Sequence, residues 1–369
     1  FIRTQGANKV AQTFRQHRDG TVYQIKYMDA VPDSAVCNEA VKLAKRHKFA
    51  QLSGFVNGVL RNIARNIDLV QFDTLSIRYS MPQWIVDRFV SAYGEKKAEE
   101  IFKAFHNKST ISIRTNLTRC TPDELRAKLE AEGVTVTAVD ELNYAFVISG
   151  FDYLNGLQSF RDGLFYVQDI SSMLVAQTAA PKKGDYVIDV CAAPGGKSTH
   201  IAELLQGSGH VLARDLTDNK VDMIEENIER HGLNNMSAEV WDATVPDADS
   251  AGKADILICD LPCSGLGVLG RKKDIRYKMT PESVDELAAL QRQILDTVHT
   301  YVKPNGVLVY STCTIDEAEN EDNVRWFIEK HPEFELDKNF AEGTGMKQIL
   351  PGEHGSDGFF IARFIKSKL

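Results

Sequence analysis

The sequence lacks the long hydrophobic runs that membrane-spanning helices need. No apolar stretch approaches the roughly 18 residues of such a helix, so we expect no membrane span. The composition, 43% hydrophobic and 25% charged, is ordinary for a globular protein, and 369 residues suffice for two or three domains. Because the first residue is Phe1 rather than methionine, we expect the chain to begin inside a longer protein.

Cysteines are also few, and their spacing is wrong for a zinc site. The chain has six, none in a C-x-x-C pair, and the closest two are Cys259 and Cys263. No second pair or histidine cluster in the sequence completes a ligand set, so we predict no metal. Such sparse cysteines are typical of reduced thiols, and we expect a cytoplasmic protein.

The chain as a whole lacks positive charge. Its formal net charge is −8, which excludes a uniformly basic nucleic-acid binder. The charge is uneven, however: residues 1–72 hold 11 Lys+Arg and 5 Asp+Glu, while residues 73–369 hold 32 and 46. A basic N-terminal unit on an acidic remainder fits a module that binds a polyanion, although a solvated basic face remains the alternative.

Phosphate-binding glycine motifs are absent from the most informative stretch, YVIDVCAAPGGKST at 186–199. We predict a buried strand over 186–190, a tight turn at Gly195 and Gly196, and a helix to about Leu205. A strand, a glycine turn and a helix form a ligand cradle at the carboxyl edge of a parallel sheet. Since the pattern is neither G-x-G-x-x-G nor a P-loop, we expect neither a dinucleotide pyrophosphate nor a triphosphate.

Four successive predicted strands end near an acid. These strands span 186–190, 210–213, 238–241 and 255–259, and the acids are Asp189, Asp215, Asp242 and Asp260. An aspartate can simply cap the next helix, but four in a row favour a ligand-binding edge.

Elsewhere the pattern predicts mainly helices before residue 110 and a mixed segment after it. We expect helices over 39–48, 51–67, 84–93, 96–105 and 283–301, and a helix that starts at a capping box, Thr121 to Glu124. In the second helix the predicted apolar face is Phe55, Val59, Ile63 and Ile67, with Leu60 beside them. Glu317, Glu319 and Asn320 are expected to open a further helix. Strands are expected over 111–115, 134–139, 145–149 and 307–310, and over 358–365 in an antiparallel edge hairpin.

Three short sequence motifs resemble those of a known family. CAAPGGK (191–197), DLPCSGLG (260–267) and STCT (311–314) resemble the signatures of the S-adenosylmethionine-dependent RNA cytosine-C5 methyltransferases, the NSun/RsmB family. The resemblance covers about residue 164 to the C-terminus. Residues 35–45 and 54–63 are similar to the later part of NusB-like RNA-binding domains.

The resemblance implies an α/β fold in three parts. A partial NusB-like helical domain (1–72) precedes a small α+β subdomain lining the RNA cleft (73–160). A Rossmann-like S-adenosylmethionine-dependent methyltransferase domain (161–369) follows, with an antiparallel C-terminal strand. It also implies a monomer that binds small-subunit ribosomal RNA and methylates C5 of a cytosine, number 967 of 16S rRNA. Two alternatives stay open: a methyltransferase of the same fold acting on protein or a small molecule, and an inactive RNA-binding assembly factor.

The resemblance also assigns the S-adenosyl-L-methionine site. The loop would hold the methionine end, Asp215 the ribose hydroxyls and Asp242 the adenine amino group. Lys220 stands where most relatives have arginine. The predicted cofactor residues are Cys191, Ala192, Ala193, Pro194, Gly195, Gly196, Lys197, Asp215, Lys220, Asp242 and Asp260.

Cytosine C5 becomes nucleophilic only after a nucleophile adds at C6, and a thiolate suits that step. By resemblance Cys313 is the nucleophile and Cys263 assists release, with Asp260 and Lys197 completing the catalytic set. The rival assignment makes Cys263, in its Pro-Cys context, the nucleophile. Either cysteine could instead be a small buried hydrophobe.

RNA contacts are predicted in two places. Asn57, Arg61 and Arg65 lie off the apolar stripe of the second helix. Residues 271–278 contain five cations and one acid, with Arg271, Lys272, Lys273 and Arg276 as candidates, although a solvated charge run is the plain alternative. RKKD replaces the family's usual R-x-P-D here, and Leu261 replaces its usual alanine.

Overall fold

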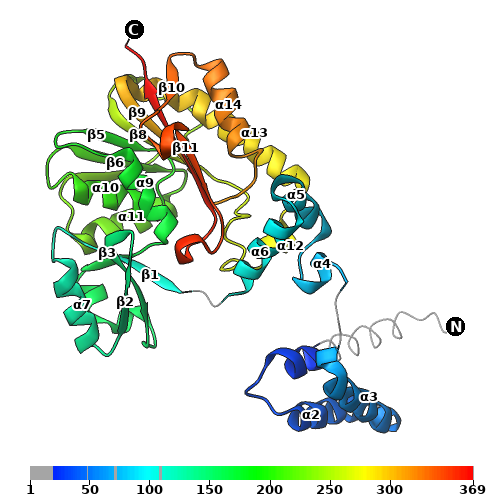
Figure 1. Ribbon diagram of the computed structural model, residues 1–369. Helices are drawn as coiled ribbons and strands as arrows, with labels where there is room; N and C mark the ends of the chain where they lie inside the picture. Colours follow the sequence, from blue (N-terminus) through cyan, green and yellow to red (C-terminus); the bar gives the residue numbers. More distant parts are fainter. Residues whose placement is uncertain (1–19, 48, 70–72, 108–109, 369) are drawn as a thin grey trace. The chain divides into compact units, whose positions relative to one another are not determined.

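A computed structural model describes residues 20–47, 49–69, 73–107 and 110–368, and Figure 1 traces the chain through them. The chain divides into two compact units, with the boundary between Arg78 and Tyr79. Residues 20–27 of the first unit are helical, and they are followed by α2 (Asp33–Arg46), α3 (Ser53–Asn66) and the short α4 (Leu75–Arg78).

Helices α2 and α3 bury a small apolar core. Cys37, Ala44, Val56 and Leu60 form this core. The predicted helix is confirmed, with Leu60 buried and Ile63 packed against the core, but Phe55 is 67% exposed and Val56 is buried instead. The four-residue spacing that begins at Phe55 drifts around a helix of 3.6 residues per turn, so it does not stay on the buried face.

The second unit begins with the helical pair α5 (Gln83–Tyr93) and α6 (Glu95–His106), followed by a small antiparallel sheet. Its strand order is β2-β3-β1-β4, formed by β1 (Ile111–Thr115), β2 (Thr135–Val139), β3 (Leu142–Ser149) and β4 (Phe165–Val167). Helix α7 (Pro122–Ala131) starts at the predicted capping box and packs Leu125 and Leu129 against this sheet. The short helix α8 (Gln158–Arg161) precedes β4, the strand that closes the sheet from beyond residue 160.

The main sheet has the order β10-β12-β9-β8-β5-β6-β7, and β11 pairs with β12. Its strands are β5 (Tyr186–Asp189), β6 (His210–Asp215), β7 (Met236–Val240), β8 (Ala254–Asp260), β9 (Val302–Thr312), β10 (Phe334–Leu336), β11 (Met346–Ile349) and β12 (Phe359–Lys366). Strands β5 to β9 are parallel, and β12 is antiparallel to β9. Chain order reverses direction beside β5, which is where ligands bind in such sheets.

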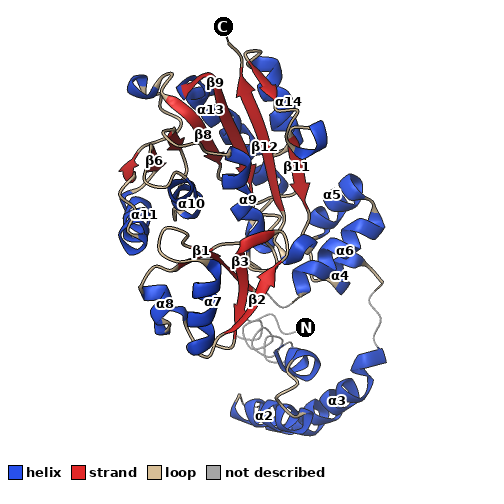
Figure 2. Cartoon of the chain, turned by 60° about the vertical axis from the view of Figure 1, so that its left-hand side comes forward, coloured by secondary structure: helices blue, strands red, loops and turns tan. Residues whose placement is uncertain are grey.

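Two helical layers cover the main sheet (Figure 2). Helices α9 (Ile170–Ala179), α10 (Gly196–Leu204) and α11 (Asp218–His231) share one core, while α13 (Pro281–Val298) and α14 (Glu321–Lys330) share the other. The short α12 (Ile275–Lys278) lies in the loop after β8. In the described residues, no helix combines the length and apolarity that a bilayer crossing requires.

The predicted antiparallel hairpin at the sheet edge is confirmed. Strand β12 pairs with β9 on one side and with β11 and β10, which form the edge, on the other. A further prediction about the C-terminal part is confirmed for one residue of three. Asn320 is the N-cap of α14, and its carbonyl accepts from the Val324 amide at 3.0 Å. Glu317 and Glu319 lie in the turn before the helix, where Glu319 is buried and accepts from the Ser264 amide.

Candidate active site

Two cysteines meet at the carboxyl ends of neighbouring strands. Strands β8 and β9 are parallel and in register, with Asp260 opposite Ser311. The chain after each strand therefore begins at the same edge, and Cys263 Sγ lies 3.2 Å from Cys313 Sγ. Both thiols are free and partly accessible. The hydrogen bond from Cys263 lowers the pKa of Cys313, and the same bond raises the pKa of Cys263.

A lysine and an aspartate lie beside the two thiols. Lys197 Nζ donates to Asp260 Oδ2 at 2.6 Å, and Ser311 Oγ donates to Asp260 Oδ1 at 2.7 Å. Burial lowers the pKa of Lys197, but the negative charge of Asp260 more than offsets this and the net pKa is raised. The ammonium therefore stays charged, and its field contributes to the lowered pKa of Cys313.

Asp189 is a neighbour to which the sequence reasoning gave no role at the site. It is fully buried at the end of β5 and accepts a hydrogen bond from Ser198 Oγ. Burial raises its pKa to about 7, and the charge of Asp260 adds to that rise. The sequence predicts Asp189 at this edge of the sheet as one of four strand-end acids, and that pattern is the signal for its place beside Asp260.

The loop that carries Cys263 is fixed by close backbone contacts. The Gly267 amide donates to the Cys313 carbonyl at 3.1 Å, and the Gly358 amide donates to the Gly267 carbonyl at 2.9 Å. A side chain at Gly267 would meet the Gly358 carbonyl oxygen at 2.3 Å. Glu319 also binds this loop, since the Ser264 amide donates to it at 2.9 Å. These residues hold the two cysteines in register.

The glycine turn is joined to the end of β6 by Asp215. This carboxylate is 4% exposed and accepts from the Ala193 amide at 2.9 Å and from Lys220 Nζ at 2.8 Å. Gly195 has φ of +101°, a conformation that glycine adopts without strain. The structure thus brings the predicted loop residues, 191–197, to the strand-end acids.

Asp242 and two apolar side chains border the same edge. Asp242 is exposed just after β7 and caps a turn by accepting from the Thr244 amide at 2.9 Å. Leu216 and Val245 are large exposed hydrophobic residues within three positions of Asp215 and Asp242. Exposed apolar side chains next to carboxylates suit a ligand with a flat apolar ring and polar edges. Sequence reasoning did not single out Leu216 or Val245.

A buried arginine of the small sheet contacts the glycine turn, as does Tyr166 of β4, whose hydroxyl donates to the Pro194 carbonyl at 3.2 Å. Arg114 on β1 donates to the Gly196 carbonyl at 2.9 Å and forms an ion pair with Glu203 of α10 at 2.9 Å. Its guanidinium therefore joins the small sheet, the turn and the helix that follows. Nothing in the sequence spacing predicted this contact.

The basic loop after β8 divides into exposed and structural cations. Lys272 and Lys273 are exposed, and the charge of Lys272 lowers the pKa of Cys313. Arg271 instead pairs with Asp169 at 2.8 Å and with Asp357 at 2.7 Å.

Arg276 is the predicted RNA contact whose position argues against that role. It is 4% exposed and donates to the backbone carbonyls of Ser80 and Leu269, each at 3.2 Å. Because its guanidinium is buried and hydrogen-bonded to backbone carbonyls, we no longer propose Arg276 as a phosphate contact.

In the N-terminal unit, the other candidate cations lie exposed on α3. Arg61 Nε donates to Asn57 Oδ1 at 3.2 Å, and Arg65 Nε donates to the Arg61 carbonyl at 3.1 Å. Both guanidinium groups keep further N–H donors for a partner.

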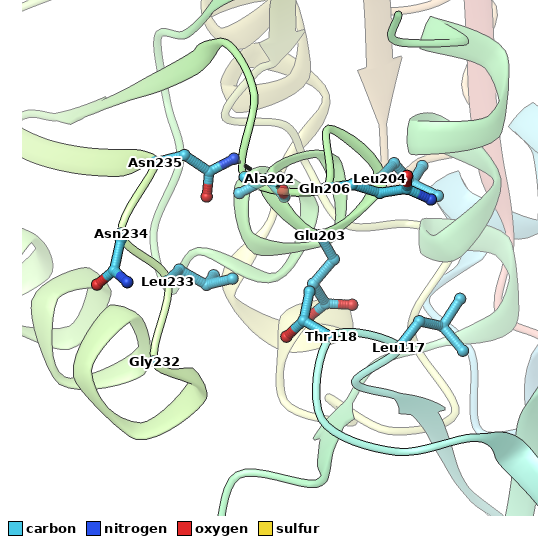
Figure 3. A pocket seen from close by; sticks show the side chains of 11 residues that line it. Leu117, Thr118, Ala202, Glu203, Leu204, Gln206, Gly232, Leu233, Asn234 and Asn235 are labelled. Atoms are coloured by element: carbon cyan, nitrogen blue, oxygen red, sulfur yellow. Dashed lines mark hydrogen bonds between the residues drawn. The ribbon is translucent and has the colours of Figure 1, made fainter. Parts of the chain in front are cut away.

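A separate cavity of about 410 Å³ lies near the ends of α10 and α11 (Figure 3). Thr118, Glu203, Asn234 and Asn235 are among its lining residues. None of the predicted catalytic or cofactor residues lines it, so it is not part of the thiol site.

Three models of known protein families match parts of this chain. The family model described as "16S rRNA methyltransferase RsmB/F" matches residues 176–365. The NusB family model matches residues 19–65, and the ferredoxin-like domain model of the RsmF/B-like methyltransferases matches residues 81–151.

Individual relatives extend the likeness to most of the chain. A Bacillus subtilis protein named "Probable ribosomal RNA small subunit methyltransferase B" is 38% identical over 94% of this chain and 81% of its own length. A solved methyltransferase homologue from Pyrococcus horikoshii is 26% identical, with a TM-score of 0.66, over 79% of this chain and 97% of its own. NSun6 from Pyrococcus horikoshii, solved with SFG, shares the fold, with a TM-score of 0.70 at 24% identity over 78% of this chain and 99% of its own.

Proposed function

Because the chain belongs to the RsmB/F family of 16S rRNA methyltransferases, we propose that it methylates C5 of one cytosine of 16S rRNA, cytosine 967, through a covalent bond between Cys313 and C6 of the base. The observation that carries the proposal is the pair of thiols 3.2 Å apart beside Lys197 and Asp260. A base-modifying site of this kind needs a thiol that can ionise, a proton donor and a nearby ion pair, and the two thiols with Lys197 and Asp260 could supply them.

The cofactor proposed is S-adenosyl-L-methionine, which supplies an electrophilic methyl group when bound. The donor set fits it: Asp215 for ribose hydroxyls, Asp242 for an adenine amino group, and loop residues 191–197 for the methionine end. Lys220 already pairs with Asp215, so it orients that carboxylate for the ribose. Leu216 and Val245 offer apolar contacts for the ring.

The proposed reaction proceeds by bond formation at Cys313 and proton transfers among the neighbouring side chains. The Cys313 thiolate forms a bond to C6, and the electron pair of the C5–C6 bond moves toward N3 as that nitrogen gains a proton from the Lys197–Asp260 pair. C5, now enamine-like, takes the methyl group and leaves the cofactor as a neutral thioether. Cys263, once it has given its own thiol proton to solvent, takes the C5 proton. The C–H electron pair then re-forms the C5–C6 double bond, Cys313 leaves as a thiolate, and N3 returns its proton to the Lys197–Asp260 pair.

The direction of the pKa shifts favours Cys313 over its rival as the nucleophile. The thiol with the lowered pKa gives more thiolate, and that thiol is Cys313. The pKa of Cys263 is raised, so when Cys313 ionises Cys263 is the thiol that keeps a proton to donate to it. Once Cys313 is bonded to carbon, the negative charge beside Cys263 is gone, which frees Cys263 for the elimination step.

The test compares two alanine variants on 16S rRNA with tritiated cofactor. Cys313→Ala should abolish methylation and form no covalent RNA adduct. Cys263→Ala should still attack and transfer the methyl group but stall before elimination, so a protein–RNA complex should accumulate as a slow band on a denaturing gel. Cys120→Ala, a thiol in the small-sheet core, is the matched control and should behave as the unaltered chain.

Exchanged gel patterns would assign the nucleophile to Cys263 instead. Full activity in both variants would rule out the thiol mechanism. The labelled nucleotide is then mapped on the rRNA, and label at a position other than cytosine 967 would reject that part of the proposal while leaving the chemistry intact.

A further inference from the structure

Two histidines and an aspartate meet near the start of β9, at the opposite end of that strand from the thiols. Asp296 and His299 end α13, and His331 follows the end of α14. Strand β9 starts just after His299 and runs 11 residues before it ends at Thr312, beside Cys313. The cluster is therefore separated from the reaction site by the full length of a strand.

The spacing of the three side chains suits one metal ion. One ligand atom from each of Asp296, His299 and His331 lies within 4.8 Å of the other two. His331 Nε2 is 3.2 Å from an Asp296 carboxylate oxygen. Ligands about 2.1 Å from a tetrahedral zinc ion lie about 3.4 Å from one another, so small side-chain movements would complete the geometry.

The tautomer of His299 is set by the backbone. Its Nδ1 lies 2.8 Å from the Asp296 carbonyl oxygen, which can only accept, so Nδ1 carries the proton. Nε2 is left with a free lone pair, as in metal-binding histidines whose other nitrogen is held by a carbonyl. Burial lowers the pKa of both His299 and His331, which favours neutral rings.

His331 supplies an independent indication of a ligand. The residue is 6% exposed, and its Nε2 is buried without a hydrogen-bond partner in the described structure, although an Asp296 oxygen is close. A buried ring nitrogen with no partner is costly, and a metal ion would satisfy it. Glu333 lies 3.7 Å from His299 Nε2 and is the nearest candidate for a fourth ligand.

We propose that Asp296, His299 and His331 bind one divalent transition-metal ion of the zinc class, with Glu333 or water as the fourth ligand. Imidazole and carboxylate ligands suit Zn²⁺ and its first-row neighbours. Lys330 pairs with the other oxygen of Asp296 at 2.9 Å and leaves the first one available. The ion would join the ends of α13 and α14, so its role is structural.

The experiment uses the whole chain after chelator treatment, with Zn²⁺ as the probe in calorimetry and Co²⁺ in absorption spectroscopy. The unaltered chain should take up one equivalent of Zn²⁺, and thermal unfolding should shift upward. Asp296→Asn and His299→Gln should each weaken binding by about tenfold or more. His354→Gln, a histidine paired with Glu141 outside the cluster, is the matched control and should bind normally.

The cysteine pair is the competing metal site, and Co²⁺ separates the two. Binding at the proposed site gives visible bands without a thiolate charge-transfer band, whereas binding at Cys263 and Cys313 gives that band. No uptake by the unaltered chain, a thiolate spectrum alone, or equal affinity in Asp296→Asn and the control would overturn the proposal. Since the Asp296 side chain is 41% exposed, its asparagine variant is expected to fold, and cofactor binding checks that it has.

Discussion

At the scale of residues, the chemistry depends on an asymmetry between two thiols. Cys263 and Cys313 share one hydrogen bond, yet the bond shifts their pKa values in opposite directions. The pKa of Cys263 rises and the pKa of Cys313 falls. Lys197 and Lys272 add positive charge near Cys313, while burial and Asp260 act against its ionisation. The largest single cause is the thiol–thiol contact, so that contact can be tested directly.

Alkylation of Cys313 by iodoacetamide should report this asymmetry. The rate should rise with pH through a midpoint below the roughly 8.5 of a free thiol. In Cys263→Ala the donor is lost, so the pKa of Cys313 should rise and the rate profile should move to higher pH. The modified residue is identified by peptide mass spectrometry, and Cys191→Ala, a neighbouring thiol that does not bind Cys313, should leave the profile in place. An unmoved midpoint in Cys263→Ala would show that Cys263 does not tune Cys313.

At the scale of elements, the thiol pair exists because three segments meet at one glycine. Gly267 lies between the Cys313 carbonyl and Gly358, and both neighbours are backbone atoms that cannot rotate away. The loop after β8, the end of β9 and the start of β12 are therefore coupled. The position of β12 inside the sheet, with β10 and β11 beyond it, makes this junction stiff.

Gly267→Ala should damage both stability and chemistry. The added carbon would lie 2.3 Å from the Gly358 carbonyl oxygen, so a segment must move, at a cost of about 1–3 kcal/mol in the free energy of unfolding. Methyl transfer in single turnover should fall as well, because the same movement separates the thiols. The control is Gly58→Ala in α3, where the added carbon meets no atom within 4 Å. A Gly267→Ala protein with unchanged unfolding and turnover would disprove the coupling.

At the scale of the whole molecule, the basic charge and the chemistry belong to different units. The described structure separates the chain between Arg78 and Tyr79, and the matched NusB segment lies before that boundary. The thiols, the glycine turn and the small sheet all lie after it. Truncation of the N-terminal unit should therefore weaken RNA binding without removing the residues proposed for methyl transfer.

Removal of residues 1–78 should lower affinity for 16S rRNA and flatten its dependence on salt, because fewer phosphates are neutralised. Cofactor binding should survive, since every proposed cofactor residue lies in the second unit. Affinity is measured by filter binding across a salt series, and cofactor binding by calorimetry. An Arg61→Gln, Arg65→Gln double variant tests the exposed cations alone. If the RNA affinity of the truncated chain depends on salt as steeply as that of the whole chain, the N-terminal unit does not contribute phosphate contacts.

The sequence by itself determined the local features of this protein. The glycine turn, the strand-end acids, the capping box of α7 and most helices and strands follow from spacing over a few residues, which the backbone must obey wherever the segment lies. The three motifs predicted the family, and the family model that matches residues 176–365 confirms that prediction.

Only the tertiary structure decided which distant residues meet. Cys263 and Cys313 are fifty positions apart and are brought together by the register of β8 and β9. Arg276 reads in sequence as one more exposed cation, yet the fold buries it against backbone carbonyls. His331 joins Asp296 because two helices end together. Such contacts depend on the packing of whole elements, and no local periodicity encodes them.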